Sequence, residues 1–193
     1  MLSEVEAKAA IAAYGVPVPE VLVTRDADEV ERAAQALLDK TDKIVVKLLS
    51  RTITHKSDVG GVVLGLETSA AAREAACAIA QRVRKQAPDA VIDGFTVQPM
   101  IVRGHAQELI LGVSSDPIFG PVIMFGQGGT AVEVVRDRAF ALPPLNSAIA
   151  QDLVSRTRVA KLLAGYRDVA PVDEAALLHA LVALSQLVCD HAQ

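Results

Sequence analysis

The residues best suited to chemistry lie together in the stretch 47–66. Two short apolar runs, residues 44–46 and 62–64, flank a polar segment that holds hydroxyls, lysines, an aspartate, His55 and the pair Gly60–Gly61. Glycines let backbone N–H groups approach an anion closely, and an imidazole can act as a base or accept a phosphoryl group near neutral pH. This pattern is typical of a phosphate-handling loop between two buried strands, although a solvated surface loop has a similar composition.

Two further sets of residues allow two interpretations each. Lys47 ends a buried strand, so its ammonium group either reaches the rim of the sheet or faces a ligand. Gly126, Gly128 and Gly129 either form a backbone nest for phosphate or make a tight turn. The remaining histidines, at positions 105, 179 and 191, lie in no such context and are expected on the surface.

Hydrophobic periodicity predicts the elements that position these residues. We expect helices from Ser3 to about Tyr14, from Asp26, from Thr68 or Ser69, and from Ser147 onward, and strands over 20–24, 44–47, 61–66, 91–99, 108–113, 121–125 and 131–135. The last helix carries an apolar stripe, Leu177, Leu181, Leu184 and Val188, that is typical of core packing. The order of these elements predicts two α/β lobes, 1–97 and 98–193.

Composition excludes several classes of function. The chain has 193 residues and a net charge of −4, and it lacks tryptophan, so it offers neither a basic surface nor a stacking platform for nucleic acid. It shows no export signal and no apolar run that could span a bilayer, which predicts a cytoplasmic protein without a membrane partner. Cys77 and Cys189 lie in apolar helical patterns and are expected to be reduced core residues.

Three segments carry a resemblance to a known family. Residues 55–62 (HKSDVGGV) resemble the HK(S/T)DxGGV motif of the ATP-grasp domain in NDP-forming acyl-CoA synthetases. Residues 112–129 (GVSSDPIFGPVIMFGQGG) resemble that family's GxxxDxxFGPxxxFGxGG run, and residues 137–145 (DRAFALPPL) resemble its DxAFxLPPL run. The family includes ADP-forming acetate–CoA ligase and is similar to the β subunit of succinyl-CoA synthetase. Ala141 departs from the family, since many members have arginine before Leu-Pro-Pro.

The resemblance implies an ATP-grasp fold that holds ATP or ADP with Mg²⁺ between its two lobes. His55 matches a histidine that relays a phosphoryl group to nucleotide, and we expect its loop to pack loosely because a carrier visits two partners. Lys47 matches a lysine that touches nucleotide phosphates. The implied nucleotide-binding set also includes Gly60, Gly61, Gln98, Pro99, Met100, Glu108, Gly126, Gly128 and Gly129. Met100 would cover the adenine ring and Glu108 would lie near the ribose, although a core methionine and a surface glutamate are the alternatives.

The resemblance also implies that residues 1–193 form an incomplete site. The main Mg²⁺ ligands of the family are expected beyond Gln193, so the fold is expected to be truncated at its C-terminus and the isolated chain inactive. Glu133 and Asp137 are the weak metal candidates inside the chain, and for these acids, as for Asp116, a structural salt bridge is the alternative. An unpaired sheet edge would allow a homodimer.

The predicted function is the nucleotide-binding domain of an ADP-forming acyl-CoA synthetase, working with a CoA-binding domain or subunit of the same enzyme. The alternative is a non-catalytic regulatory domain in a fusion with a protein lysine acetyltransferase. The intact His55 weighs against that alternative, since a regulatory domain needs no phosphoryl carrier.

Overall fold

The computed structural model describes residues 3–53, 55–104, 106–129 and 135–191, and these residues form two compact units. Unit 1 comprises Pro19–Val102, and unit 2 comprises Glu4–Val18 together with the chain from Arg103 onward. The expected lobe boundary between residues 97 and 98 stays a prediction. The observed grouping adds that the first helix belongs with the second half of the chain.

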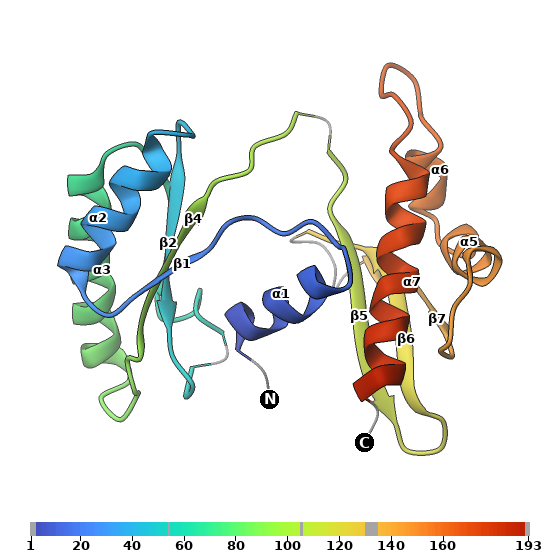
Figure 1. Cartoon of the computed structure of the whole chain (residues 1–193), viewed down its shortest axis with the longest axis horizontal. Helices are drawn as coiled ribbons and strands as arrows, with labels where there is room; N and C mark the ends of the chain where they lie inside the picture. The colour runs from blue at the N-terminus through green and yellow to red at the C-terminus, as the bar shows by residue number, and fades with distance from the viewer. Residues whose placement is uncertain (1–2, 54, 105, 130–134, 192–193) are drawn as a thin grey trace. The chain divides into compact units, whose positions relative to one another are not determined.

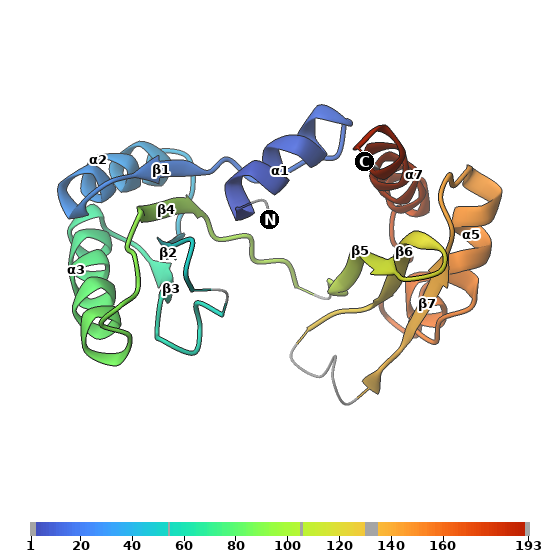
Figure 2. The same ribbon diagram turned by 90° about the horizontal axis from the view of Figure 1, so that it is seen from below.

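Unit 1 is a four-stranded antiparallel sheet covered by two helices. Its elements are β1 (Leu22–Thr24), α2 (Ala27–Leu38), β2 (Ile44–Leu49), β3 (Val62–Leu66), α3 (Ser69–Gln86) and β4 (Gly94–Pro99), and the strand order is β1-β4-β2-β3. Both views show α2 and α3 on the same side of this sheet (Figures 1 and 2). The other side of the sheet therefore has no helix of unit 1 against it.

Side-chain capping and apolar spacing explain why the two helices begin and pack as they do. The side chains of Asp26 and Thr68 accept hydrogen bonds from the third residue after them, which satisfies backbone donors at the helix start. The buried positions recur at helical spacing and pack on the buried face of the sheet. This core comprises Val30, Ala34, Leu37, Ile44, Val46, Leu48, Ala72, Ala76, Ile79, Val83, Phe95 and Val97.

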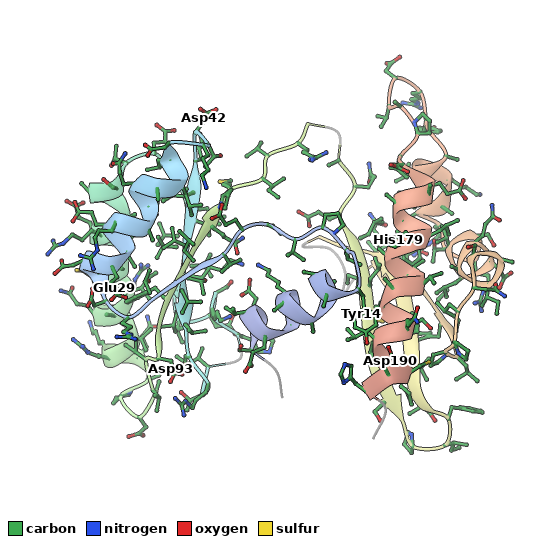
Figure 3. All side chains as sticks on the ribbon, in the orientation of Figure 1. Tyr14, Glu29, Asp42, Asp93, His179 and Asp190 are labelled. Atoms are coloured by element: carbon green, nitrogen blue, oxygen red, sulfur yellow. The ribbon has the colours of Figure 1, made fainter. Side chains whose placement is uncertain are left out.

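Unit 2 pairs a three-stranded antiparallel sheet with helices. Its elements are α1 (Glu4–Ala13), β5 (Leu109–Asp116), β6 (Gly120–Gln127), β7 (Arg138–Ala141), α5 (Ser147–Ser155), α6 (Ala160–Leu163) and α7 (Glu174–His191), with strand order β5-β6-β7. Leu181 of the expected stripe is buried in the core of this unit, with the other three members packed against it. The hydroxyl of Tyr14 donates to the carboxylate of Asp190 at 2.7 Å, which joins the end of α1 to α7 (Figure 3).

The strand expected over 131–135 lies outside the described residues except Val135, which is helical, and β7 at Arg138–Ala141 was not expected. The structure corrects the expectation that the two cysteines are core residues, because Cys77 and Cys189 are exposed free thiols. The core-facing side of α3 is formed by Ala72, Ala75, Ala76, Ile79 and Val83, and position 77 lies outside it. Within the described ranges, no helix combines the length and apolarity that a membrane span requires.

Candidate functional site

Lys47 and Gln98 lie on the side of the unit 1 sheet that faces away from α2 and α3. Lys47 of β2 is paired with Thr96 of β4, and Gln98 is paired with Val45. Residues that oppose one another in an antiparallel pair share a face, and successive residues alternate between faces. Since Val46 is in the core against the helices, Lys47 and Gln98 share the opposite face. Lys47 thus lies within β2 and not at its end, and its expected contact with nucleotide phosphates stays a prediction.

The segment expected to form the hinge continues the sheet of unit 1. Gln98 and Pro99 end β4, and Pro99 is paired with Ile44. The backbone N–H of Met100 donates to the carbonyl of Lys43 at 2.8 Å. Because this N–H is used within unit 1, an adenine ring would have to use other backbone groups of the hinge.

The loop between β2 and β3, residues 50–61, is fixed at its start by side chains. Arg51 donates from its backbone N–H and its Nε to the carboxylate of Asp93, at 2.8 and 2.9 Å, and also from Nη2. The hydroxyl of Thr52 accepts from the N–H of Val91 at 2.9 Å. Asp93, labelled in Figure 3, directly precedes β4. The first residues of the loop are therefore tied to the segment that enters β4, which differs from the loose packing expected of the whole loop.

The second half of the loop closes on itself through three backbone hydrogen bonds. Asp58 N–H donates to the carbonyl of His55 at 3.2 Å, Gly60 N–H to Ser57 at 3.0 Å, and Gly61 N–H to Lys56 at 2.7 Å. The two glycine amides are thus used inside the loop. The expected contact of this glycine pair with a nucleotide phosphate stays a prediction.

The loop needs both glycines for its shape. Gly60 adopts a φ of +61°, a conformation that side chains with a Cβ disfavour. At Gly61 a Cβ would lie 2.8 Å from the carbonyl oxygen of Lys56 and 3.2 Å from Cβ of Leu48. The side chain of Arg82, on α3, covers Gly60, with its Nη1 3.0 Å from where a Cβ would be. The fold leaves His55 exposed on this closed turn.

The glycine-rich segment of unit 2 packs closely on the residues before β5. The N–H of Gly128 donates to the carbonyl of Glu108 at 2.7 Å, and Oε2 of Glu108 lies 3.1 Å from where a Cβ on Gly129 would be. A Cβ on Gly126 would lie 2.3 Å from the carbonyl of Asp137. The structure therefore brings the predicted residues Glu108, Gly128 and Gly129 together, while Gly126 lies within β6, paired with Ile110 and Arg138, where the close approach of β7 leaves no room for a Cβ.

Asp116 and Asp137 have structural roles. Asp116 accepts from the N–H groups of Ile118 and Phe119 in the β5–β6 turn. Asp137 is buried and accepts from the N–H groups of Arg158 and Val159 at 2.8 and 2.7 Å.

Burial opposes ionisation of Asp137, but the two amides and the charge of Arg158 outweigh it, so its pKa lies below the ordinary value of 3.8. Glu133 lies outside the described residues, and those that are described contain no group of three His, Cys, Asp or Glu suited to a metal ion.

Of these contacts, the sequence indicated neither Asp93 nor Arg82. Arg51 and Asp93 are 42 residues apart, and no local pattern connects them. Within unit 1 the structure brings Lys47, Gln98 and the His55 loop onto one sheet, and convergence of this set with the glycine turn of unit 2 stays a prediction.

Comparison with known proteins identifies the family. A family model described as an ATP-grasp domain matches residues 1–193. The β subunit of acetate–CoA ligase (ADP-forming) I from Pyrococcus furiosus is 35% identical over 189 residues, which cover 98% of this chain and 79% of that subunit. The 4-hydroxybutyrate–CoA ligase (ADP-forming) of Nitrosopumilus maritimus is 36% identical over 189 residues, and the match covers 26% of that longer protein.

Solved structures agree with this result. Acetyl-coenzyme A synthetase 1 of Ca. Korarchaeum cryptofilum, in complex with coenzyme A and Ca-AMPCP, superposes with a TM-score of 0.89 at 35% identity, covering 98% of this chain and 81% of that one. The same synthetase with Mg-AMPPCP, its phosphohistidine segment pointing towards the nucleotide-binding site, gives a TM-score of 0.79 at 32% identity, covering 99% and 79%. The expected α/β ATP-grasp fold is confirmed, and the chain belongs to the ATP-grasp family as a domain of an ADP-forming acid–CoA ligase.

Proposed function

We propose that this domain binds ATP or ADP with Mg²⁺ and exchanges a phosphoryl group between phosphorylated His55 and the nucleotide, as part of an ADP-forming acetyl-CoA synthetase. The observation that carries the proposal is the position of His55. His55 is exposed on a turn closed by Gly60 and Gly61. This turn is part of the loop that connects β2, the strand of Lys47, to β3. An exposed imidazole can receive a group from one partner and deliver it to another.

The reaction balances without any redox partner. In the direction of ATP formation, an oxygen of the β-phosphate of ADP attacks the phosphorus atom on His55. The P–O bond forms as the P–N bond breaks, and the imidazole keeps the electron pair of that bond. Lys47 supports the transfer by placing positive charge on the sheet face that Gln98 shares. Such transfer depends mainly on positioning and charge neutralisation.

The described residues account for only part of a magnesium site. When bound, Mg²⁺ neutralises charge on the nucleotide phosphates. It usually takes one or two carboxylates, with phosphate and water as the other ligands. Both oxygens of Asp137 accept backbone hydrogen bonds, and the described residues hold no cluster of three metal-binding side chains. Glu108 is the acid among the proposed nucleotide-binding residues. Its side chain is exposed and lies beside Gly129, so we expect it to face the nucleotide.

The relatives support the choice of partner. Two of them are named as β subunits, and in single-chain ligases the matching region is about a quarter of the protein. We infer that this domain works with a CoA-binding domain or subunit, while cytoplasmic location and a homodimer stay predictions. The regulatory alternative gains no support, because the relatives reported above are ligases and synthetases.

The test uses the complete synthetase that contains this domain. His55→Ala should abolish acyl-CoA-dependent ATP formation and phosphorylation of the domain by Mg-ATP, while nucleotide binding measured by calorimetry is retained. His191→Ala, which removes an exposed histidine at the end of α7, is the matched control and should keep full turnover. Undiminished turnover by His55→Ala would refute the relay.

A further inference from the structure

The contacts of Arg51 differ from those of the other ion pairs in unit 1. Three donors of one residue, the backbone N–H, Nε and Nη2, all meet the carboxylate of Asp93. The side chain of Asp93 is 19% exposed and that of Arg51 is 76% exposed, whereas in the pairs Lys43–Glu67 and Arg73–Asp28 neither partner is less than 47% exposed. Nε and Nη2 both donate to Oδ1 and the backbone N–H donates to Oδ2, so charge-assisted hydrogen bonds hold the carboxylate through both oxygens.

The partner of Arg51 is itself held in place by the sheet. The N–H of Asp93 donates to the carbonyl of Leu49 at 2.9 Å, which extends the β2–β4 pairing by one residue. Gly94, the next residue, has a φ of +141°, and a Cβ there would lie 2.2 Å from the carbonyl of Thr24. Asp93 is therefore a fixed point on unit 1, and the pKa of its carboxyl is lowered chiefly by the hydrogen bonds from Arg51.

The pair lies at the start of the loop, on the segment that leads from β2 to His55. Arg51 stands two residues after β2 and four before His55. The hydroxyl of Ser50 accepts from the N–H groups of Thr52 and Ile53, both at 3.2 Å. The end of the loop is held as well, because the carbonyl of Gly61 accepts from the N–H of Leu48 at 2.7 Å and Val59 packs against the core of unit 1. Side-chain bonds thus hold the start of the loop, backbone bonding and apolar packing hold its end, and His55 is exposed between the two.

We propose that the Arg51–Asp93 pair is the positioning device of the phosphoryl carrier, an inference that rests on the proposed function of His55. The pair holds the start of the loop in one direction, so that the segment leading into His55 presents the imidazole reproducibly to its reaction partners. Neither residue touches the nucleotide or the reacting atoms. Loss of the pair lowers the fraction of molecules in which His55 is correctly directed. The reaction then slows, because small misplacements of reacting groups are costly in rate.

The experiment compares Asp93→Asn and Arg51→Ala with wild type in the complete synthetase. Asp93→Asn keeps the shape of the side chain but removes the charge that the guanidinium pairs with. Both variants should lower kcat by about tenfold to a hundredfold and leave the nucleotide KM unchanged, because Lys47 and Gln98 lie in strands that the change does not touch. Arg51→Lys keeps a cation with one point of contact and should recover part of kcat.

Asp28→Asn is the matched control. It removes the carboxylate of another arginine pair of unit 1, Arg73–Asp28, whose Nε–O distance is also 2.9 Å but which joins α2 to α3 away from the loop. Its kcat should equal that of wild type. Hydrogen exchange adds a second readout: the amides of Asp58, Gly60 and Gly61 should exchange faster in Asp93→Asn and at the wild-type rate in Asp28→Asn.

The outcomes separate this inference from the function on which it rests. If His55→Ala keeps full turnover, the relay is wrong and the positioning role falls with it. If His55→Ala is inactive but Asp93→Asn matches Asp28→Asn in kcat and in exchange, only the positioning role is overturned. A rise in nucleotide KM with unchanged kcat in Asp93→Asn would also overturn it, as would an equal loss of thermal stability and activity in Asp93→Asn and Asp28→Asn.

Discussion

Gly61→Ala should distort the His55 loop, and the structure gives the size of the effect. The added Cβ would lie 2.8 Å from the carbonyl oxygen of Lys56, and ordinary contacts begin at 3.4 Å. The two atoms must therefore separate by about 0.6 Å. Leu48 blocks the simplest retreat, because its Cβ is already 3.2 Å from the new atom on the other side.

Two effects destabilise the Gly61→Ala variant, and a third effect stabilises it. Weakening the 2.7 Å bond from Gly61 N–H to Lys56 costs about 0.5–1.5 kcal/mol, and packing an extra methyl group costs about 1–3 kcal/mol. Alanine also restricts the unfolded chain, which stabilises the protein by about 0.4–1 kcal/mol. The clash exceeds this gain, so unit 1 should lose about 1–3 kcal/mol of stability.

Hydrogen exchange at the amide of Leu48 measures the effect locally, since this amide donates to the carbonyl of Gly61 at 2.7 Å. Turnover of the complete synthetase measures the consequence for the loop, and we expect it to fall. Gly104→Ala is the matched control, because a Cβ at Gly104 would meet no atom within 4 Å. If Gly61→Ala and Gly104→Ala have equal stability and equal Leu48 exchange, the close approach to Lys56 does not constrain the loop and the reasoning is wrong.

The other predictions concern charge. Lys47→Met keeps the apolar stem and removes the ammonium group, so calorimetry should show nucleotide Kd rising by about tenfold or more while thermal stability is retained; an unchanged Kd would place Lys47 outside the site. Asp137→Ala leaves the amides of Arg158 and Val159 without their acceptor. Denaturant unfolding should show a loss of about 2–4 kcal/mol of stability. A loss as small as that from replacing an exposed aspartate would contradict the role of Asp137 as the acceptor for these two amides. Because the pKa of Asp137 is lowered in the folded protein, its contribution is complete above the unfolded value near 3.8 and is lost as pH falls through the lower folded value. The stability difference between wild type and Asp137→Ala should therefore shrink in acid below about pH 4, and a difference that is constant down to pH 2 would refute this linkage.

Sequence was sufficient wherever a local pattern decides the structure. The apolar runs on both sides of the His55 loop became β2 and β3, and the helix starts expected at Asp26 and at Thr68 or Ser69 were confirmed. The identity of the loop itself was also local, since HKSDVGGV is a continuous segment. Spacing, capping and a contiguous motif each depend on residues within a few positions of one another, so they can be read from the chain alone.

Tertiary structure decided how that loop is held and how its residues are used. The sequence shows that Gly60 and Gly61 are present, but only the folded chain shows that their amides bond to the carbonyls of Ser57 and Lys56. Likewise, the role of Arg51 depends on Asp93, which is 42 residues away in the sequence and directly precedes β4. Which donor meets which acceptor across such a separation depends on strand order and register, and these are set by the packing of the whole sheet on α2 and α3.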